Sequence, residues 1–276
     1  MIIGIVGLGL IGGSLAKALK TYTDHTVWGI DLDESTMAAA LREGTVDRRL
    51  ETSDLKVCDG VLIALFPDAV VTYMSAHRAD FNPNGWIVDC GGVKMPVMNG
   101  VDAFRKEYGW QFVGGHPMAG REFCGYFNAQ AGLFQRASMI LTPYADTPAE
   151  TVENLSRFFE SLGFGRIQLT TPDFHDQMIA YTSQLAHVVS SAYVKGELVG
   201  EQKGFVAGSF ADMTRVARLN EEMWTQLFMS NQQPLLHELD ALIRRLGEYR
   251  DALANRDAQT MRQLLKAGRE IKEGLS

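Results

Sequence analysis

The chain has 276 residues, enough for two domains, and its 46% hydrophobic and 21% charged residues are typical of a globular enzyme. A formal net charge of −7 argues against a nucleic-acid partner and offers no polybasic surface for a membrane. Three widely spaced cysteines without a CxxC pair, and no apolar run near the ~20 residues that span a bilayer, favour a cytoplasmic protein without a disulfide framework.

The first 31 residues follow the order of a dinucleotide-binding βαβ unit. A short apolar strand is expected at residues 2–6, followed by the pattern GxGxxG at residues 7–12 and an amphipathic helix over residues 14–20. A second apolar strand over residues 26–30 ends at Asp31. Because strand, glycine-rich turn, helix, strand and acid occur in this order, the segment predicts a Rossmann-type nucleotide site.

The three glycines of the turn have separate parts in such a site. Gly7 permits the tight turn, Gly9 lets the backbone approach a pyrophosphate, and Gly12 lets the helix lie close to the strand. The phosphates then lie at a helix N-terminus, where unpaired N–H groups and the helix dipole favour negative charge. We therefore expect the cofactor to contact Gly7, Leu8, Gly9, Leu10, Ile11 and Gly12.

Asp31 indicates which cofactor is used. It follows Gly12 by 19 residues (31 − 12), the spacing at which a carboxylate accepts hydrogen bonds from a ribose 2′-hydroxyl and repels a 2′-phosphate. The next two residues, Leu32 and Asp33, include no arginine that would bind that phosphate. The sequence therefore favours NAD over NADP.

Strand and helix patterns alternate as far as about residue 170. Strands are expected at residues 60–66, 86–89, 111–115, 138–142 and 166–170, and helices at residues 34–42, 68–78, 97–107 and 148–162. The continuous apolar run at residues 60–66 is typical of a parallel strand buried on both faces. Ligands bind at the carboxyl ends of such strands, so Phe66, Pro67 and Gly91 are expected to join the cofactor site.

Strand patterns stop near residue 172, and helical periodicity continues almost to the last residue. One long helix is expected over residues 172–200, then shorter ones at residues 210–217, 221–230, 235–254 and 258–273. We predict a doubly wound parallel α/β domain over residues 1–171 and an all-α domain over residues 172–276. Apolar residues recur at helical spacing in the last part, which fits packing within one chain or the homodimer that we expect: Leu235, Leu239, Ile243 and Leu246.

His116 is the histidine best placed for chemistry, since it follows an expected strand on the cleft side. Its neighbours Gly114, Gly115, Ala119 and Gly120 are small and would let a substrate approach closely. Imidazole can take a proton near neutral pH, as oxidation of a hydroxyl group requires. The alternative is a histidine that only caps a turn, and position alone leaves both interpretations open.

Arg215 stands on a segment of mostly small and apolar residues. An arginine buried there needs an acidic partner, which could be Asp212 three residues earlier or an anionic ligand. Downstream of the domain boundary, His187 follows Ser183 by four residues and so shares one helix face with it. No histidine, cysteine or acid cluster has the spacing of a metal site, and no metal is expected.

Taken together, these residues resemble the prephenate/arogenate dehydrogenase family of tyrosine biosynthesis. The resemblance extends from Gly7 to about Trp224 and depends on several segments in a fixed order: GLGLIGGS (7–14), DCGGVK (89–94), GHPMAGRE (115–122), Leu133-Phe134, His175-Asp176 with Ala180, Ser183 and His187, and residues 208–217. It implies a Rossmann domain, a helical domain that dimerises, and oxidative decarboxylation of a cyclohexadienyl substrate, prephenate or arogenate.

The resemblance also implies roles for individual residues. His116 matches the catalytic histidine that binds the hydroxyl group on ring carbon 4, and Arg215 matches an arginine that binds a substrate carboxylate. His187 and Gly208 match other positions of the substrate pocket, and we place Ser183 and Gln184 there with them. His116 would take the hydroxyl proton while hydride leaves for the nicotinamide, and loss of the ring carboxylate would yield an aromatic ring.

The chain departs from the family pattern around the substrate pocket. Gly92 stands where the family has serine, and Gln184 where it has histidine; Ala186, Ser209 and Ala211 replace a proline, a glycine and an arginine. An amino-substituted prephenate is therefore a further candidate substrate. A β-hydroxyacid dehydrogenase would need a Lys-x-x-x-Asn pair that the chain lacks, and a non-catalytic NAD sensor would need neither His116 nor Arg215.

Overall fold

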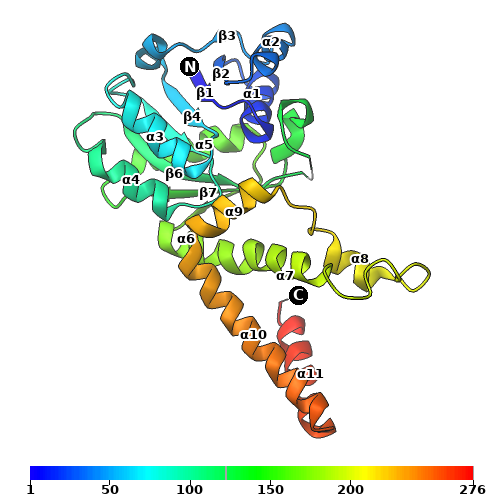
Figure 1. Cartoon of the computed structure of the whole chain (residues 1–276). Helices are drawn as coiled ribbons and strands as arrows, with labels where there is room; N and C mark the ends of the chain where they lie inside the picture. The colour runs from blue at the N-terminus through cyan, green and yellow to red at the C-terminus, as the bar shows by residue number, and fades with distance from the viewer. Residues whose placement is uncertain (122, 276) are drawn as a thin grey trace.

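A computed structural model of the chain describes residues 1–121 and 123–275. The N-terminal part is an eight-stranded sheet with helices on both faces, and the C-terminal part is helical (Figure 1). The strands are β1 (Ile2–Val6), β2 (Thr26–Ile30), β3 (Arg48–Arg49), β4 (Gly60–Ile63), β5 (Trp86–Asp89), β6 (Gln111–Pro117), β7 (Ser138–Pro143) and β8 (Arg166–Leu169). The order across the sheet is β3-β2-β1-β4-β5-β6-β7-β8.

The sheet is parallel from β3 to β6, as expected, but its last two strands run the other way. β7 pairs with β6 in the antiparallel sense, and β8 is parallel to β7. In the described residues of the connection from β6 to β7, the helical elements are the short 3-10 helices η2 (Tyr126–Asn128) and η3 (Ala131–Phe134), and none is a crossover helix. Because a parallel neighbour needs a crossover, the doubly wound sheet that the sequence predicts is mostly parallel, with antiparallel pairing at this edge.

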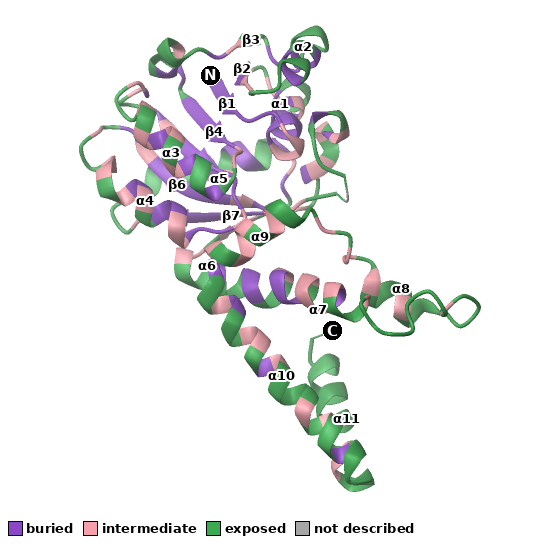
Figure 2. Ribbon diagram, viewed as in Figure 1, coloured by how far each residue is buried: buried purple, intermediate pink, exposed green. Residues whose placement is uncertain are grey.

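Helices cover the sheet on both faces and bury two cores (Figure 2). One face carries α1 (Leu10–Tyr22), α2 (Glu34–Arg42) and α5 (Ala149–Ser161), with Leu15, Met37 and Phe159 fully buried. The other face carries α3 (Pro67–His77), α4 (Met95–Arg105) and the 3-10 helix η1 (Thr52–Val57). Alternating strands and helices with both sheet faces covered are the doubly wound arrangement that the sequence predicts.

The helical part differs from its prediction in one place. The long helix expected over residues 172–200 is three segments: α6 (Pro172–Ile179), a π-helical turn η4 (Ala180–Gln184) and α7 (Leu185–Tyr193). The remaining helices are α8 (Gly208–Thr214), α9 (Glu221–Ser230), α10 (Gln232–Ala254) and α11 (Ala258–Glu273). No helix in the described ranges is long and apolar enough to cross a membrane.

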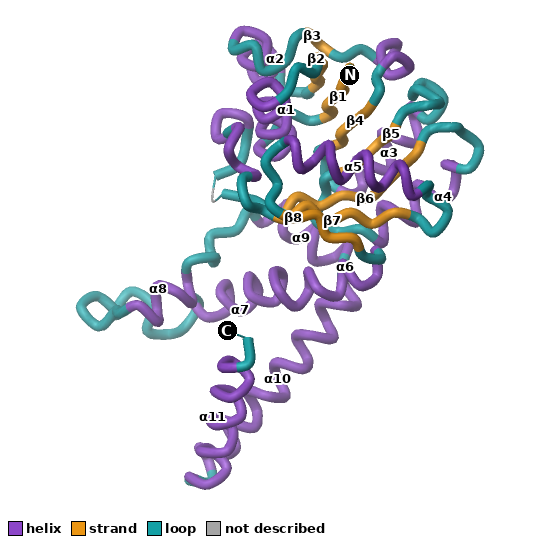
Figure 3. Tube along the Cα trace, turned by 180° about the vertical axis from the view of Figure 1, so that it is seen from behind, coloured by secondary structure: helices purple, strands orange, loops and turns teal. Residues whose placement is uncertain are grey.

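The two parts meet along α6 and α9, while α10 and α11 form a hairpin that projects away from the sheet (Figures 1 and 3). A small core joins Ala180, Leu185 and Leu235 of the helical part, with Leu239 packed against it. Further along α10, Ile243 and Leu246 are 57% and 58% exposed. Of the four apolar positions predicted on this helix, two therefore pack within the chain and two are free to meet another surface.

Candidate active site

The glycine-rich loop lies between β1 and α1 and requires glycine at two positions. Gly7 has a φ of +87°, in the left-handed region that favours glycine. A Cβ atom at Gly12 would lie 1.8 Å from the carbonyl oxygen of Gly7, so only glycine lets α1 pack this closely. A Cβ at Gly9 would meet no heavy atom within 4 Å, which leaves that side of the loop open.

The N-terminus of α1 fits a phosphate group. Gly9 is the capping residue and offers no side-chain acceptor, so the first N–H groups of α1, beginning at Leu10 and Ile11, lack a side-chain cap. Free N–H groups at the positive end of a helix dipole bind anions. Together with the open space at Gly9, this end of the helix can hold the pyrophosphate of a dinucleotide.

Asp31, at the end of β2, has a contact that the sequence does not predict. Its Oδ2 accepts a hydrogen bond from the N–H of Leu8 at 2.7 Å, and its Oδ1 accepts one from the N–H of Asp33 at 2.9 Å. The carboxylate thus fixes the glycine-rich loop to the end of β2. A carboxylate oxygen can accept more than one donor, so a ribose hydroxyl can still bind Asp31.

The other predicted cofactor residues lie at the ends of the strands beside β1. Phe66 precedes α3 and is 53% exposed, and Pro67 is the first residue of that helix. Gly91 follows β5 and donates its N–H to Oδ2 of Asp89 at 2.9 Å. Because β1, β4 and β5 are neighbours, the fold gathers these residues at one edge of the sheet.

His116 lies within β6 and not after it, because antiparallel pairing with Ile140 of β7 continues the strand through Pro117. Its side chain is partly buried. A Cβ at Gly92 would lie 4.0 Å from Nε2 of His116, so the loop after β5 runs past this nitrogen. The base predicted from the sequence therefore lies beside the loop at the carboxyl end of β5. Glu122, at the end of the GHPMAGRE segment, lies outside the described residues.

A fully buried ion pair next to His116 was not predicted. Lys94 and Asp89 have no exposed side-chain surface, and Nζ of Lys94 donates to Oδ2 of Asp89 and, at 2.5 Å, to the carbonyl oxygen of Gly115. Asp89 Oδ1 in turn accepts from the N–H of Gly115 at 3.2 Å. The pair fixes the backbone of the residue before His116. Both residues stand in DCGGVK, but no periodic pattern indicates that they pair.

His116 contacts a second histidine from the helical domain. Its Nδ1 lies 2.9 Å from Nε2 of His175, and Nδ1 of His175 lies 2.7 Å from Oδ1 of Asp176. Burial lowers the pKa of His116 well below its usual 6.5, and the positive charge of Lys94, together with any proton on His175, lowers it further. Burial also lowers the pKa of His175, against the opposing effect of Asp176. Both imidazoles are therefore neutral near pH 7.

Ser183 and Gln184 lie in the π-helical turn, a feature that is frequent at functional sites. Gln184 is buried; its Oε1 accepts from Nδ2 of Asn231 at 2.7 Å, and its Nε2 donates to the carbonyl oxygen of Leu227 at 3.3 Å. The carbonyl oxygen of Ser183 lies 2.9 Å from Nδ1 of His187. Gln184 thus joins α9 and α10 to the turn, a structural contact that the sequence does not predict.

His187 stacks on Trp224 of α9, with ring centroids 4.0 Å apart. Gly208 begins α8 and Arg215 follows its last turn, beyond the end of α7 (Figure 1). Arg215 is exposed, and within residues 1–121 and 123–275 it forms no ion pair with Asp212. The internal salt bridge considered from the sequence is therefore absent, and the guanidinium group is available to an anion. No hydrogen bond joins Arg215 to His116 in the described chain, where His116 bonds to His175.

A Rossmann-type nucleotide site and a partly buried histidine at the junction with a helical domain define the class: a two-domain nucleotide-dependent oxidoreductase. Residues 15–168 match the nucleotide-binding domain of prephenate dehydrogenase, and residues 171–267 match its dimerization domain. These matches cover most of the chain, and the protein belongs to the prephenate dehydrogenase family.

Individual relatives agree with this assignment. The prephenate dehydrogenase of Bacillus subtilis (strain 168) is 31% identical, over 98% of this chain and 75% of its own length. The cyclohexadienyl dehydrogenase of Zymomonas mobilis is 32% identical, over 99% of this chain and 95% of its own. The crystal structure of Synechocystis arogenate dehydrogenase superposes with a TM-score of 0.85 at 27% identity and covers both chains completely.

Proposed function

We propose that this protein catalyses the NAD-dependent oxidative decarboxylation of prephenate to 4-hydroxyphenylpyruvate, with His116 as the catalytic base. The observation that carries the proposal is the position of His116. It is a neutral histidine whose Nδ1 is engaged by His175, and its Nε2 lies beside the loop at Gly92. A relative named prephenate dehydrogenase at 31% identity supports the substrate.

NAD is the proposed cofactor, and its nicotinamide would accept the hydride. The glycine-rich loop and the first turn of α1 would hold the pyrophosphate, and Asp31 would accept a hydrogen bond from the adenosine ribose. Phe66, Pro67 and Gly91 would line the site further along the sheet edge, toward His116. The carboxylate of Asp31 would repel the additional phosphate of NADP, which supports the preference for NAD.

The chemistry requires little more than positioning and one mobile proton. His116 Nε2 takes the proton of the hydroxyl group on ring carbon 4 as hydride leaves that carbon. The ring carboxylate then departs as carbon dioxide, its electron pair completes the aromatic ring, and His116 returns the proton to the phenolate oxygen. Aromatisation makes the sequence of steps nearly irreversible.

We assign substrate binding to residues of the helical domain. Arg215 would bind a carboxylate, since guanidinium groups pair with carboxylates in a bidentate manner. His187, with Ser183 and Gly208, would line the pocket, and Gln184 would act mainly by fixing the turn that carries Ser183. Because α8 lies apart from His116, this assignment requires α8 to approach the sheet when substrate binds, or the substrate to span the two.

The substrate could also be arogenate or an amino-substituted prephenate. A Cβ at Gly92 would lie 3.3 Å from Cδ2 of Leu227, so a leucine side chain packs against the position where the family has serine. The pocket near His116 is therefore less polar at this point, which bears on substrate choice and not on the class of reaction. The family relationship to arogenate dehydrogenase at 27% identity keeps this alternative open.

We further propose that the protein is a cytoplasmic homodimer, with residues 1–171 as the nucleotide domain and residues 172–276 as the substrate and dimerisation domain. The match of the helical part to a dimerization domain and the exposed apolar side chains of α10 support the dimer.

Purified protein with NAD and each candidate substrate tests the proposal. Formation of reduced cofactor is followed by absorbance, and the aromatic product and carbon dioxide are identified separately. We expect turnover with prephenate that is faster with NAD than with NADP. Absence of turnover with all three substrates would overturn the proposed function, and faster turnover with arogenate or the amino analogue would replace prephenate.

A further inference from the structure

Three side chains form a line from the candidate base to the start of a helix. His116 of β6 contacts His175 of α6, and His175 contacts Asp176, the next residue along. His175 is 1% exposed and Asp176 is 2% exposed, so water has little access to the contacts between them. The line crosses the junction between the two domains. Its Asp176 end is held by hydrogen bonds from α4 of the sheet domain.

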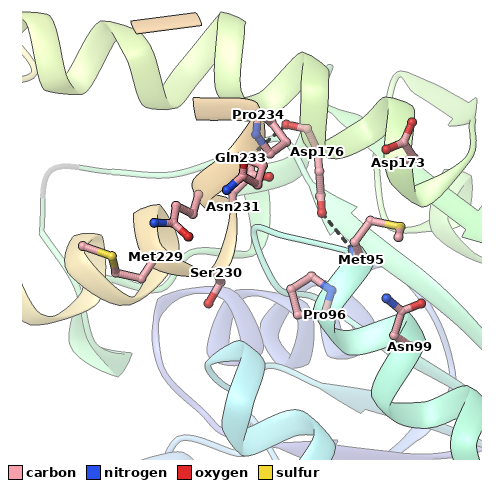
Figure 4. A pocket seen from close by; sticks show the side chains of 11 residues that line it. Met95, Pro96, Asn99, Asp173, Asp176, Met229, Ser230, Asn231, Gln233 and Pro234 are labelled. Carbon is pink, nitrogen blue, oxygen red and sulfur yellow. Dashed lines mark hydrogen bonds between the residues drawn. The ribbon is translucent and has the colours of Figure 1, made fainter. Parts of the chain in front are cut away.

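Asp176 is fixed by the N-terminus of α4. Its Oδ1 accepts from the N–H of Lys94, and its Oδ2 accepts from the N–H of Met95, each at 2.8 Å (Figure 4 shows the second bond). These N–H groups have no partner within α4, and the positive end of the helix dipole favours a negative charge there. Asp176 is therefore an ionised acceptor, and both of its oxygens are in use.

The acceptor at Asp176 determines where the protons of both histidines lie. A carboxylate has no proton to donate, so Nδ1 of His175 must carry the hydrogen that joins it to Oδ1. A neutral imidazole has one N–H, which leaves Nε2 of His175 as an acceptor. That acceptor takes the hydrogen of Nδ1 of His116, and Nε2 of His116 is left with its lone pair.

We infer that His175 and Asp176 are positioning residues that set the tautomer of His116, so that Nε2 is the nitrogen available to take a proton. The inference rests on the proposed role of His116 as the base. The opposite tautomer would carry a hydrogen on Nε2 and could not accept the substrate proton. Orientation of a base by a third group is a general feature of catalytic constellations.

The substitution Asp176→Asn would exchange the protonated and unprotonated nitrogens of both imidazoles. An asparagine amide can donate to Nδ1 of His175, which moves the hydrogen of His175 to Nε2. That hydrogen would be donated to Nδ1 of His116, and Nε2 of His116 would become protonated. With the amide nitrogen in the place of Oδ1, the amide oxygen takes the place of Oδ2 and accepts from the N–H of Met95, while the N–H of Lys94 loses its acceptor.

Nitrogen NMR of histidine-labelled protein, at a pH above 7 where both rings are neutral, tests the tautomers without any need for turnover. In the unsubstituted protein we expect His116 Nε2 to have the chemical shift of an unprotonated ring nitrogen and Nδ1 that of a protonated one. Asp176→Asn should exchange the two assignments in both histidines. A protonated His116 Nε2 in the unsubstituted protein would overturn the inference even if the enzyme turns over as proposed.

Kinetics provide a second test. Asp176→Asn should lower kcat by about 10²–10⁴-fold and leave KM nearly unchanged, with a lower melting temperature because the N–H of Lys94 loses its acceptor. Asp173→Asn is the matched control, because Asp173 lines the same surface pocket (Figure 4) and, in the part of the chain that the structure describes, its side chain accepts a hydrogen bond from Gln177 and none from α4. This control should retain full activity.

A double substitution separates positioning from a general structural effect. The amide oxygen of His175→Gln can accept the hydrogen of His116 Nδ1 whatever residue stands at 176. In protein that already carries His175→Gln, Asp176→Asn should therefore lower kcat by less than about tenfold, far less than it does in the unsubstituted protein. If the two losses multiply instead, Asp176 acts independently of His175 and the inference is wrong.

Discussion

The carboxylate of Asp31 accepts a hydrogen bond from the N–H of Leu8 at 2.7 Å and so joins the end of β2 to the glycine-rich loop. One side chain is thus placed both to shape the loop and to bind a ribose hydroxyl. Asp31→Ala should raise the KM for NAD by about tenfold, the loss of a charge-assisted hydrogen bond, and should lessen the preference over NADP. Steady-state kinetics with both cofactors measure this.

Asp24→Ala is the control for Asp31, because it removes the same charge from an exposed position at the opposite end of β2. Its cofactor preference should equal that of the unsubstituted enzyme. A higher kcat/KM with NADP than with NAD in the unsubstituted enzyme would contradict the assignment of Asp31.

Gly9 and Gly12 offer a matched pair of alanine substitutions. Gly12→Ala places a methyl group 1.8 Å from the Gly7 carbonyl oxygen, so α1 must move, and overpacking of this kind costs about 1–3 kcal/mol. Gly9→Ala adds its methyl group in open space at a φ of −64°, which alanine adopts readily. We expect Gly12→Ala to lower the melting temperature, and Gly9→Ala to weaken only NAD binding. Calorimetry distinguishes them, and equal melting temperatures would argue against the close packing.

His116 and Arg215 should affect different kinetic constants. His116→Asn should lower kcat by about 10²–10⁴-fold and remove the ionisation of the base from the pH profile of kcat/KM. Arg215→Ala should act mainly on the KM for substrate, with a loss of at least about 2 kcal/mol for a charge pair with a carboxylate. Arg218→Ala, another exposed arginine nearby, should change neither constant. Near-normal kcat in His116→Asn would remove His116 from its assigned role.

Stability should depend on pH because burial lowers the pKa of both His116 and His175. The unfolded chain, with histidine pKa values of about 6.5, binds more protons than the folded protein below that pH. The free energy of unfolding should therefore fall as the pH decreases from neutrality, by up to about 1.4 kcal/mol per pH unit for each proton. Urea unfolding at several pH values measures the slope.

His175→Gln should make this slope shallower, because one of the two buried groups no longer titrates. His25, whose pKa burial also lowers, and His116 remain in the variant, so part of the slope should persist. An unchanged slope in His175→Gln would mean that the pKa of His175 is the same in the folded protein and in the unfolded chain.

The exposed apolar side chains of α10 are expected to lie at the dimer interface. Ile243→Glu combined with Leu246→Glu should convert a species of twice 30.5 kDa into a monomer in sedimentation experiments. Glu248→Lys, an exposed charge reversal on the same helix, should leave the dimer intact. A 30.5 kDa species for the unsubstituted protein at micromolar concentration would rule out the dimer.

Local patterns alone determined the nucleotide-binding βαβ unit of the protein. The strand, the glycine-rich turn, α1, β2 and Asp31 are set by neighbours within a few residues, so periodicity and glycine spacing are sufficient to predict them. The change from α/β to helical structure near residue 172 was visible for the same reason. The resemblance to a family added the roles of His116 and Arg215, which no periodic pattern distinguishes from structural residues.

Tertiary structure decided what those residues contact. The bond between His116 and His175 joins positions 59 residues apart, and the Lys94–Asp89 pair depends on a dry interior that no sequence pattern reports. The π-helical turn and the antiparallel β7 likewise depend on packing between distant segments. Local propensity selects strands and helices, but the domain junction that orients the imidazole of His116 exists only after both domains have folded and packed.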